Sequence, residues 1–127
     1  MTERKKISIL YVDDEEINLF LFKSLFELEF DVITSSSGDD ALNVLSNMDG
    51  QIDVIISDMN MPEMNGLEFI ASARGKYGDI VYFILSGYNV SDEIDQAIRE
   101  DIIRQYFPKP FTYDDIAEAV LDAKRQN

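Results

Sequence analysis

Short β-branched apolar runs alternate along this chain with longer amphipathic segments, and this alternation strongly restricts the possible fold. The short runs predict five strands, at Ile7 to Val12, Asp31 to Thr34, Ile52 to Ser57, Ile80 to Leu85 and Gln105 to Phe107. The segments between and after them predict five helices, at Glu15 to Leu28, Asp39 to Met48, Gly66 to Arg74, Ser91 to Arg99 and Tyr113 to Lys124. The predicted order is a strand followed by a helix, five times.

The strand runs are almost continuously apolar, as in Ile52 to Ser57 and Ile80 to Leu85. Such runs are typical of parallel strands that helices cover on both faces. Since crossovers between parallel strands are right-handed, the chain is predicted to fold as a three-layer α/β sandwich. Asn65 with Glu68 and Ser91 with Asp92 are typical starts of the helices that follow them.

Polar side chains follow four of the five predicted strands. Asp13 and Asp14 follow the first strand, Asp58 the third, Ser86 the fourth and Lys109 the fifth. In a doubly wound sheet the ligand site lies outside the carboxyl ends of the strands, where the winding direction reverses. These side chains are therefore predicted to meet at one edge of the sheet.

Three carboxylates at one place repel one another unless a cation neutralises them. Mg²⁺ suits such a site because it prefers hard oxygen ligands and is usually held by carboxylates together with phosphate. With that ion and Lys109 drawing charge from a phosphoryl group, Asp58 can act as a carboxylate nucleophile. Ser86 can donate a hydrogen bond to a phosphoryl oxygen.

Composition narrows the chemistry further. The 127 residues suit one domain and contain no cysteine and no histidine, so metal ligands within the chain must be oxygen atoms. A formal charge of −14 argues against direct nucleic-acid binding, which depends on Lys and Arg. No apolar stretch approaches the roughly 20 residues of a membrane span, and no signal core follows the basic start at Arg4 to Lys6. We expect no membrane contact and a cytoplasmic location.

Four stretches, ILYVDDEE, VIISDMNMPEMNG, ILSG and FPKPF, resemble in order and spacing the receiver domains of two-component response regulators. The resemblance extends from about Lys6 to Lys124, and we expect residues 1–127 to form a single receiver domain. It implies a flavodoxin-like (βα)5 fold whose five-stranded parallel sheet has the order 2-1-3-4-5. It also implies a signalling switch that catalyses its own phosphorylation and slow dephosphorylation, rather than an enzyme.

Site residues follow from the resemblance position by position. Asp58 corresponds to the phospho-accepting aspartate, and Asp13 and Asp14 to the acidic pair that binds Mg²⁺. Asn60 corresponds to the residue whose backbone carbonyl completes the metal ligands, and Lys109 to the lysine that pairs with the acyl phosphate.

The resemblance also implies a conformational switch. Ser86 matches the hydroxyl position that senses the phosphoryl group, with the small Gly87 beside it, and Tyr106 matches the switch aromatic. The bond between Lys109 and Pro110 is expected to be cis. Phosphorylation would move Ser86 and Tyr106, and thereby alter how the surface of the fourth helix, fifth strand and fifth helix binds a downstream effector.

These 127 residues contain no histidine, so they hold no phosphohistidine donor of their own. The resemblance implies that the donor is a histidine kinase or a histidine phosphotransfer protein. Such partners dock on the first helix in this family. That helix carries two apolar stripes, and a helix that covers a sheet needs only one. We expect the second stripe, Leu19, Phe22 and Phe26, to be either a partner or self-association surface or covered by other segments.

Tyr88 is expected to slow loss of the phosphoryl group, because it and the Asn60 side chain lie beside the path of the attacking water in this family.

Three other functions are alternatives to a phosphorylated receiver. A receiver fold that only binds partners and is not phosphorylated is one. An aspartate-nucleophile phosphohydrolase is another, but Asn60 stands where that class has a second Asp. A flavin or dinucleotide module would need a Gly-rich or Ser-rich turn in place of Asp13 to Glu16. Output is expected through a separate protein or through a segment outside this sequence.

Overall fold

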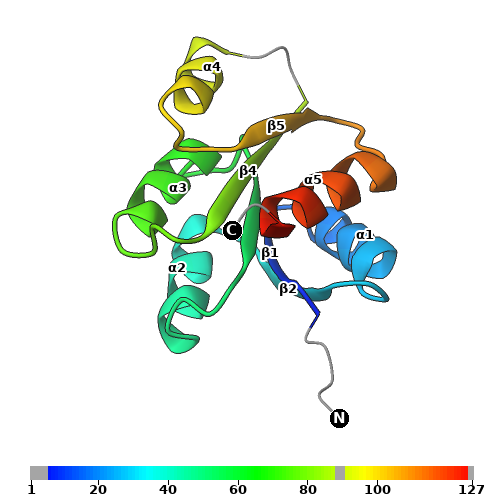
Figure 1. Cartoon of the computed structure of the whole chain (residues 1–127). Helices are drawn as coiled ribbons and strands as arrows, with labels where there is room; N and C mark the ends of the chain where they lie inside the picture. Colours follow the sequence, from blue (N-terminus) through cyan, green and yellow to red (C-terminus); the bar gives the residue numbers. More distant parts are fainter. Residues whose placement is uncertain (1–5, 88–90, 126–127) are drawn as a thin grey trace.

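The computed structural model describes residues 6–87 and 91–125, which form a parallel sheet with helices on both faces (Figure 1). The strands are β1 (Ser8–Val12), β2 (Asp31–Ser35), β3 (Val54–Asp58), β4 (Val81–Ser86) and β5 (Gln105–Pro108). The helices are α1 (Glu16–Phe26), α2 (Gly38–Asn47), α3 (Gly66–Arg74), α4 (Asp92–Arg99) and α5 (Tyr113–Arg125). The strand order is β2-β1-β3-β4-β5, so the predicted α/β class and sheet order are confirmed.

Alternation along the strands divides the core into two layers. In β1, Ile9 and Tyr11 pack into the cluster that contains the buried side chains of α1 and α5. Leu10 and Val12 pack into the cluster that contains those of α2, α3 and α4. Figure 1 shows α1 and α5 together on one side of the sheet and α2 and α3 on the other. The three central strands, β1, β3 and β4, are buried on both faces, which explains why their sequences are almost continuously apolar.

Side-chain caps start four of the helices; at α5 the Thr112 hydroxyl accepts a hydrogen bond from the backbone of Asp115. At α3, Asn65 accepts a hydrogen bond from the backbone of Glu68, and the Glu68 carboxylate accepts one from the backbone of Asn65, which completes a capping box. Ser91 caps α4 and Ser37 caps α2 in the simpler one-sided way. The helix starts predicted at Asn65 and Ser91 are therefore confirmed, and each satisfies backbone N–H groups that lack a partner within the helix.

The third strand begins two residues later than predicted, at Val54 instead of Ile52. Asp53, which precedes the strand, is joined to β1 through its side chain as well as its backbone. Its carboxylate accepts hydrogen bonds from the backbone and the hydroxyl of Ser8, at 2.9 and 3.2 Å. The strand also extends one residue further than predicted, so Asp58 is its last residue rather than the first residue beyond it.

Of the two alternatives for the stripe of Leu19, Phe22 and Phe26 on α1, the covered one is confirmed and the partner or self-association surface is wrong. Phe22 and Phe26 are fully buried, and Leu19 is partly buried against the same cluster. The Tyr11 and Phe22 rings stack with centroids 4.1 Å apart, and Phe22 stacks on Phe26 at 4.3 Å. This stripe therefore faces the sheet, and it cannot serve as a binding surface in the folded protein.

The other apolar stripe of this helix is the exposed one. Its members are about half or more exposed and include Leu28 just beyond the end of the helix; we call them the outer α1 stripe: Ile17, Phe20, Leu21, Leu25 and Leu28. Within the described residues, these five are the only large hydrophobic side chains in that exposure class. Apolar patches of this kind usually mark a contact surface.

No helix in residues 6–87 or 91–125 combines the length and apolar character that a membrane span requires.

Candidate functional site

The structure brings the predicted polar residues to one edge of the sheet, because β1, β3, β4 and β5 are parallel neighbours. Asp13 directly follows β1, Asp58 and Ser86 are the last residues of β3 and β4, and Lys109 directly follows β5. The β3 and β4 registers place Asp58 opposite Leu85, next to Ser86. Sequence spacing therefore located this edge correctly.

Three carboxylates converge at this edge. One oxygen from each of Asp13, Asp14 and Asp58 lies within 4.8 Å of the other two. Asp13 is fully buried and Asp58 nearly so, whereas Asp14 is exposed, so the cluster opens to solvent on one side. Oxygen donors in this arrangement are the type that a hard divalent cation such as Mg²⁺ prefers. The residues present therefore fit such an ion.

Lys109 lies against this cluster. Its Nζ is 2.8 Å from Asp58 Oδ1 and 3.8 Å from Asp13 Oδ2. Burial alone would lower the pKa of Lys109, but the hydrogen bond to Asp58 and the charges of Asp58 and Asp13 raise it above its ordinary value. The ammonium group therefore stays charged at neutral pH.

One ammonium group does not balance three carboxylates. Burial raises the pKa of Asp58 above its ordinary value, and the neighbouring charges of Asp13 and Asp14 act in the same direction. The hydrogen bond from Lys109 opposes this shift without cancelling it. The site thus holds an excess of negative charge, which a divalent cation would relieve.

Asp13 is fixed by three hydrogen-bond donors. The Tyr11 hydroxyl and the Asn18 side-chain amide donate to Oδ2 at 2.8 and 3.2 Å, and the backbone N–H of Glu15 donates to Oδ1 at 3.0 Å. Burial, and then the charge and hydrogen bond of Asp13, raise the pKa of Tyr11, so the phenol remains a donor. Sequence analysis missed both Tyr11 and Asn18. Tyr11 could have been noticed, because it precedes Asp13 by two residues, the repeat of one strand face.

The loop after β3 is held close to Asp58 by Gly66. A Cβ atom at Gly66 would lie 2.4 Å from the backbone carbonyl oxygen of Asp58, a distance that no side chain tolerates. The Gly66 backbone N–H also donates to the carbonyl of Met59 at 2.9 Å. Asn60 lies exposed in this loop, and its predicted role as a metal ligand stays a prediction.

On the other side of the site, the backbone joins β4 to the lysine. The Lys109 backbone N–H donates to the carbonyl of Ser86 at 2.9 Å, and the Lys109-Pro110 bond is cis, as predicted. Ser86 is buried, and Gly87 is exposed. Tyr106 is partly buried against the cluster that includes α4. The sensing role of Ser86 and the switching role of Tyr106 stay predictions. Tyr88 lies outside the described residues.

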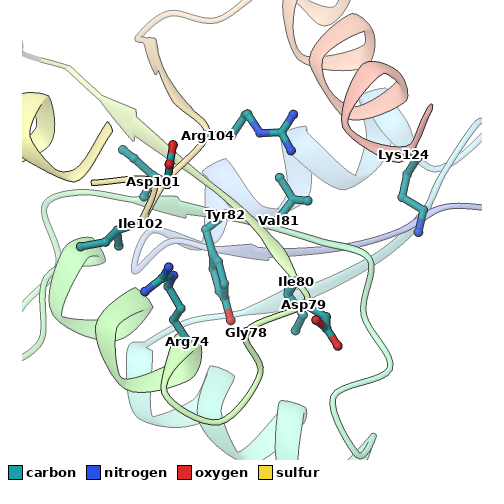
Figure 2. Close-up of a pocket in the computed structure, with 11 residues that line it drawn as sticks. Arg74, Gly78, Asp79, Ile80, Val81, Tyr82, Asp101, Ile102, Arg104 and Lys124 are labelled. Carbon is teal, nitrogen blue, oxygen red and sulfur yellow. The ribbon is translucent and has the colours of Figure 1, made fainter. Parts of the chain in front are cut away.

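A hollow lies at the opposite edge of the sheet. Its volume is about 590 Å³, and Figure 2 shows Arg74, Tyr82, Arg104 and Lys124 around it. These residues come from the end of α3, the start of β4, the segment before β5 and the end of α5. The hollow therefore lies away from the carboxylate cluster, which surrounds the other ends of the same strands.

Comparison with known proteins defines the class of this fold and site. A family model for the response regulator receiver domain matches residues 9–121, and the chain belongs to this family of two-component signalling domains. A response regulator receiver domain protein from Clostridium thermocellum has a TM-score of 0.88 and 30% identity, with 94% of this chain and 95% of that chain covered. The likeness extends over nearly the whole of both chains, so it covers the site as well as the sheet.

Longer relatives carry a similar domain. The chain is 34% identical over 119 residues to the hydrogenase transcriptional regulatory protein HoxA of Cupriavidus necator, covering 94% of this chain and 24% of that protein. It is 29% identical over 116 residues to the sensor kinase CckA of Brucella abortus, covering 91% of this chain and 12% of that protein. The chain therefore spans about a quarter or less of these relatives, and their full activities do not transfer to it.

Proposed function

We propose that this receiver domain accepts a phosphoryl group on Asp58 from the phosphohistidine of a histidine kinase or a histidine phosphotransfer protein. The observation that carries the proposal is the convergence of Asp13, Asp14 and Asp58 within 4.8 Å, with Lys109 2.8 Å from Asp58. An Asp58 oxygen attacks phosphorus and forms the acyl phosphate. The P–N bond breaks, and the imidazole leaves with its electron pair.

Mg²⁺ is the proposed cofactor, held by the carboxylates of Asp13, Asp14 and Asp58 and by the backbone carbonyl of Asn60. The three carboxylates support this assignment because they supply only oxygen atoms and carry more negative charge than Lys109 balances. When bound, Mg²⁺ neutralises charge at the site and draws electron density from the phosphoryl oxygens. The nearly buried Asp58 is then free of the repulsion that would oppose an incoming phosphoryl group.

Lys109 and Ser86 would stabilise the phosphorylated state. The Lys109 ammonium, now hydrogen-bonded to Asp58, would transfer its contact to a phosphoryl oxygen, and the Ser86 hydroxyl would donate to another. Movement of Ser86 and Tyr106 would then alter the surface formed by α4, β5 and α5, which is the proposed binding surface for a downstream effector. We infer that residues 1–127 act as one receiver domain, with output through another protein or a further segment.

The donor protein would dock on the outer α1 stripe. Two contacts join the start of α1 to the site, because the Asn18 amide and the Glu15 backbone N–H both donate to Asp13. A helical partner that covers the stripe therefore reaches the edge that holds Asp58. Glu16 at the start of α1 and Glu27 just beyond its end are also exposed, with a single lysine, Lys23, between them, so the partner surface that fits is apolar with a mostly basic rim.

Replacing Phe20 and Leu25 by Ser tests this docking surface. The double variant should fold normally, since both side chains are half or more exposed. Its phosphorylation by a phosphorylated histidine phosphotransfer protein should slow markedly, while phosphorylation by acetyl phosphate should be unchanged. Equal rates from the protein donor before and after the change would rule out the outer α1 stripe as the docking surface.

Intact-mass measurement after incubation with Mg²⁺ and acetyl phosphate tests the phosphorylation itself. We expect a phosphoryl adduct on the wild type and on Asp53→Asn, and none on Asp58→Asn. Asp53 is the matched control because it also pairs with a lysine, at 3.0 Å, at the other edge of the sheet. An unmodified wild-type protein would favour the alternative, a receiver that binds partners without being phosphorylated.

A further inference from the structure

The hydroxyl of Tyr11 makes a contact that the proposed reaction does not yet use. It donates a hydrogen bond to Asp13 Oδ2, the same oxygen that accepts from Asn18, while Oδ1 accepts from the backbone of Glu15. An ionised carboxylate has about four lone-pair positions, two on each oxygen. Among the described residues, these donors fill both positions on Oδ2 and one on Oδ1, while the Lys109 ammonium, 3.8 Å from Oδ2, is too far away for a hydrogen bond. Asp13 therefore keeps one acceptor position on Oδ1 for a cation or a water bound to it.

The Tyr11 ring is held more firmly than the other side-chain donor. It is buried in β1 and stacks on Phe22 with centroids 4.1 Å apart and planes 6° apart. Phe22 in turn stacks on Phe26. Asn18, by contrast, is partly exposed on α1 and donates over a longer distance, 3.2 Å against 2.8 Å. The orientation of Asp13 thus depends on a phenol that the aromatic core of the protein immobilises.

We propose that Tyr11 is a positioning residue for the metal site: its hydroxyl holds Asp13 Oδ2 and so leaves Oδ1 to the cation. Tyr11 does not touch the cation and acts only through Asp13. Hydrogen-bond partners of metal ligands commonly change metal affinity by about 10- to 100-fold when removed. The inference rests on the proposed function, since it assumes that Asp13 binds Mg²⁺.

Tyr82 provides a matched control for this role. Like Tyr11, it is a buried strand tyrosine whose hydroxyl donates a hydrogen bond of 2.8 Å. Its acceptor is the backbone carbonyl of Tyr77, and its ring lies beside the hollow at the opposite edge of the sheet (Figure 2). Replacing either tyrosine by Phe removes one phenol hydrogen bond, but only Tyr11→Phe removes one from Asp13.

Isothermal titration calorimetry with Mg²⁺ on wild type, Tyr11→Phe and Tyr82→Phe tests the proposal, at a temperature where circular dichroism shows all three folded. We expect Tyr11→Phe to bind Mg²⁺ about 10-fold more weakly or worse, and Tyr82→Phe to bind it as the wild type does. Equal Mg²⁺ affinity in wild type and Tyr11→Phe would overturn the role of Tyr11 alone. A wild type that binds no Mg²⁺ would overturn the proposed function and this inference with it.

A second measurement needs no variant. In wild-type protein with ¹³C-labelled tyrosine, the Tyr11 Cζ resonance should shift during an Mg²⁺ titration and follow the binding curve of the whole protein. The Tyr82 resonance should stay in place. A Tyr11 resonance that does not respond to saturating Mg²⁺ would overturn the proposal, even if Tyr11→Phe did not fold.

Discussion

Two aspartate and lysine pairs lie at opposite edges of the same sheet, and they differ in what surrounds them. Asp58 and Lys109 are 2.8 Å apart at the carboxyl edge, and Asp53 and Lys124 are 3.0 Å apart at the amino edge. The Asp53 carboxylate also accepts two hydrogen bonds from Ser8. Burial alone would raise the pKa of Asp53, but the Ser8 and Lys124 contacts lower it below its ordinary value.

At the carboxyl edge the balance is reversed. Burial and the charges of Asp13 and Asp14 raise the pKa of Asp58 despite the hydrogen bond from Lys109. An ion pair alone therefore does not distinguish the two aspartates. The unbalanced negative charge around Asp58 does, because it favours binding of a cation there.

The largest difference between the two edges should appear when each lysine is replaced by Met. Lys109→Met should slow phosphorylation by acetyl phosphate by about 100-fold, because it removes a charge that stabilises the transferring group. Lys124→Met should leave that rate unchanged and lower the free energy of unfolding by less than about 1 kcal/mol, since its ion pair is partly exposed. Rates measured by intact mass and stabilities measured by urea unfolding check both. A similar rate for the two variants would remove the distinction between the edges.

Mg²⁺ should stabilise the protein by binding only at the carboxyl edge of the sheet. At a concentration 100 times its dissociation constant, the ion should raise the free energy of unfolding by about 2.7 kcal/mol. The same increase should occur in Asp53→Asn and should vanish when Asp13 and Asp14 are both changed to Asn. Urea unfolding with Mg²⁺ and with EDTA measures these increments. An increase that survives the double change would place the ion elsewhere.

The smallest effect concerns the pH dependence of stability at the amino edge. Because folding lowers the pKa of Asp53, its contribution to stability is present above the ordinary value of 3.8 and is lost as pH falls through the folded value. Asp53→Asn should therefore be less stable than wild type by about 1 kcal/mol at pH 6, a figure kept small because the site is partly exposed. The gap should begin to narrow as pH falls below 3.8. Unfolding curves from pH 3 to pH 6 test this, and a constant gap would contradict it.

Sequence patterns predicted the sheet and the edge that holds Asp58 because both depend on local spacing. A residue that ends a buried parallel strand must emerge at the carboxyl edge, wherever the helices pack. Asp58 and Lys109 are 51 positions apart in the sequence, yet each could be placed from the apolar run that precedes it.

The outer and inner faces of α1 could not be assigned in this way. Both stripes are apolar, so helical periodicity alone does not say which one faces the sheet. The deciding contacts come from distant segments. The Tyr113 ring stacks on Phe26 with centroids 4.8 Å apart, and the ring centroids of Phe111 and Phe22 are 5.9 Å apart. The Asp53 network escaped prediction for the same reason, because Lys124 lies 71 residues further along the chain.

The close approach of Gly66 to Asp58 makes the two sides of the site unequal in free space. On the α3 flank there is no room for even one additional carbon atom beside the Asp58 carbonyl. On the β4 flank a Cβ at Gly87 would meet Lys109 only at 3.9 Å, an ordinary contact. Asp58 is thus tightly packed on the α3 side, with more room on the β4 side. We therefore expect a bulkier, more highly charged residue at this position to be accommodated by movement of β4 and β5.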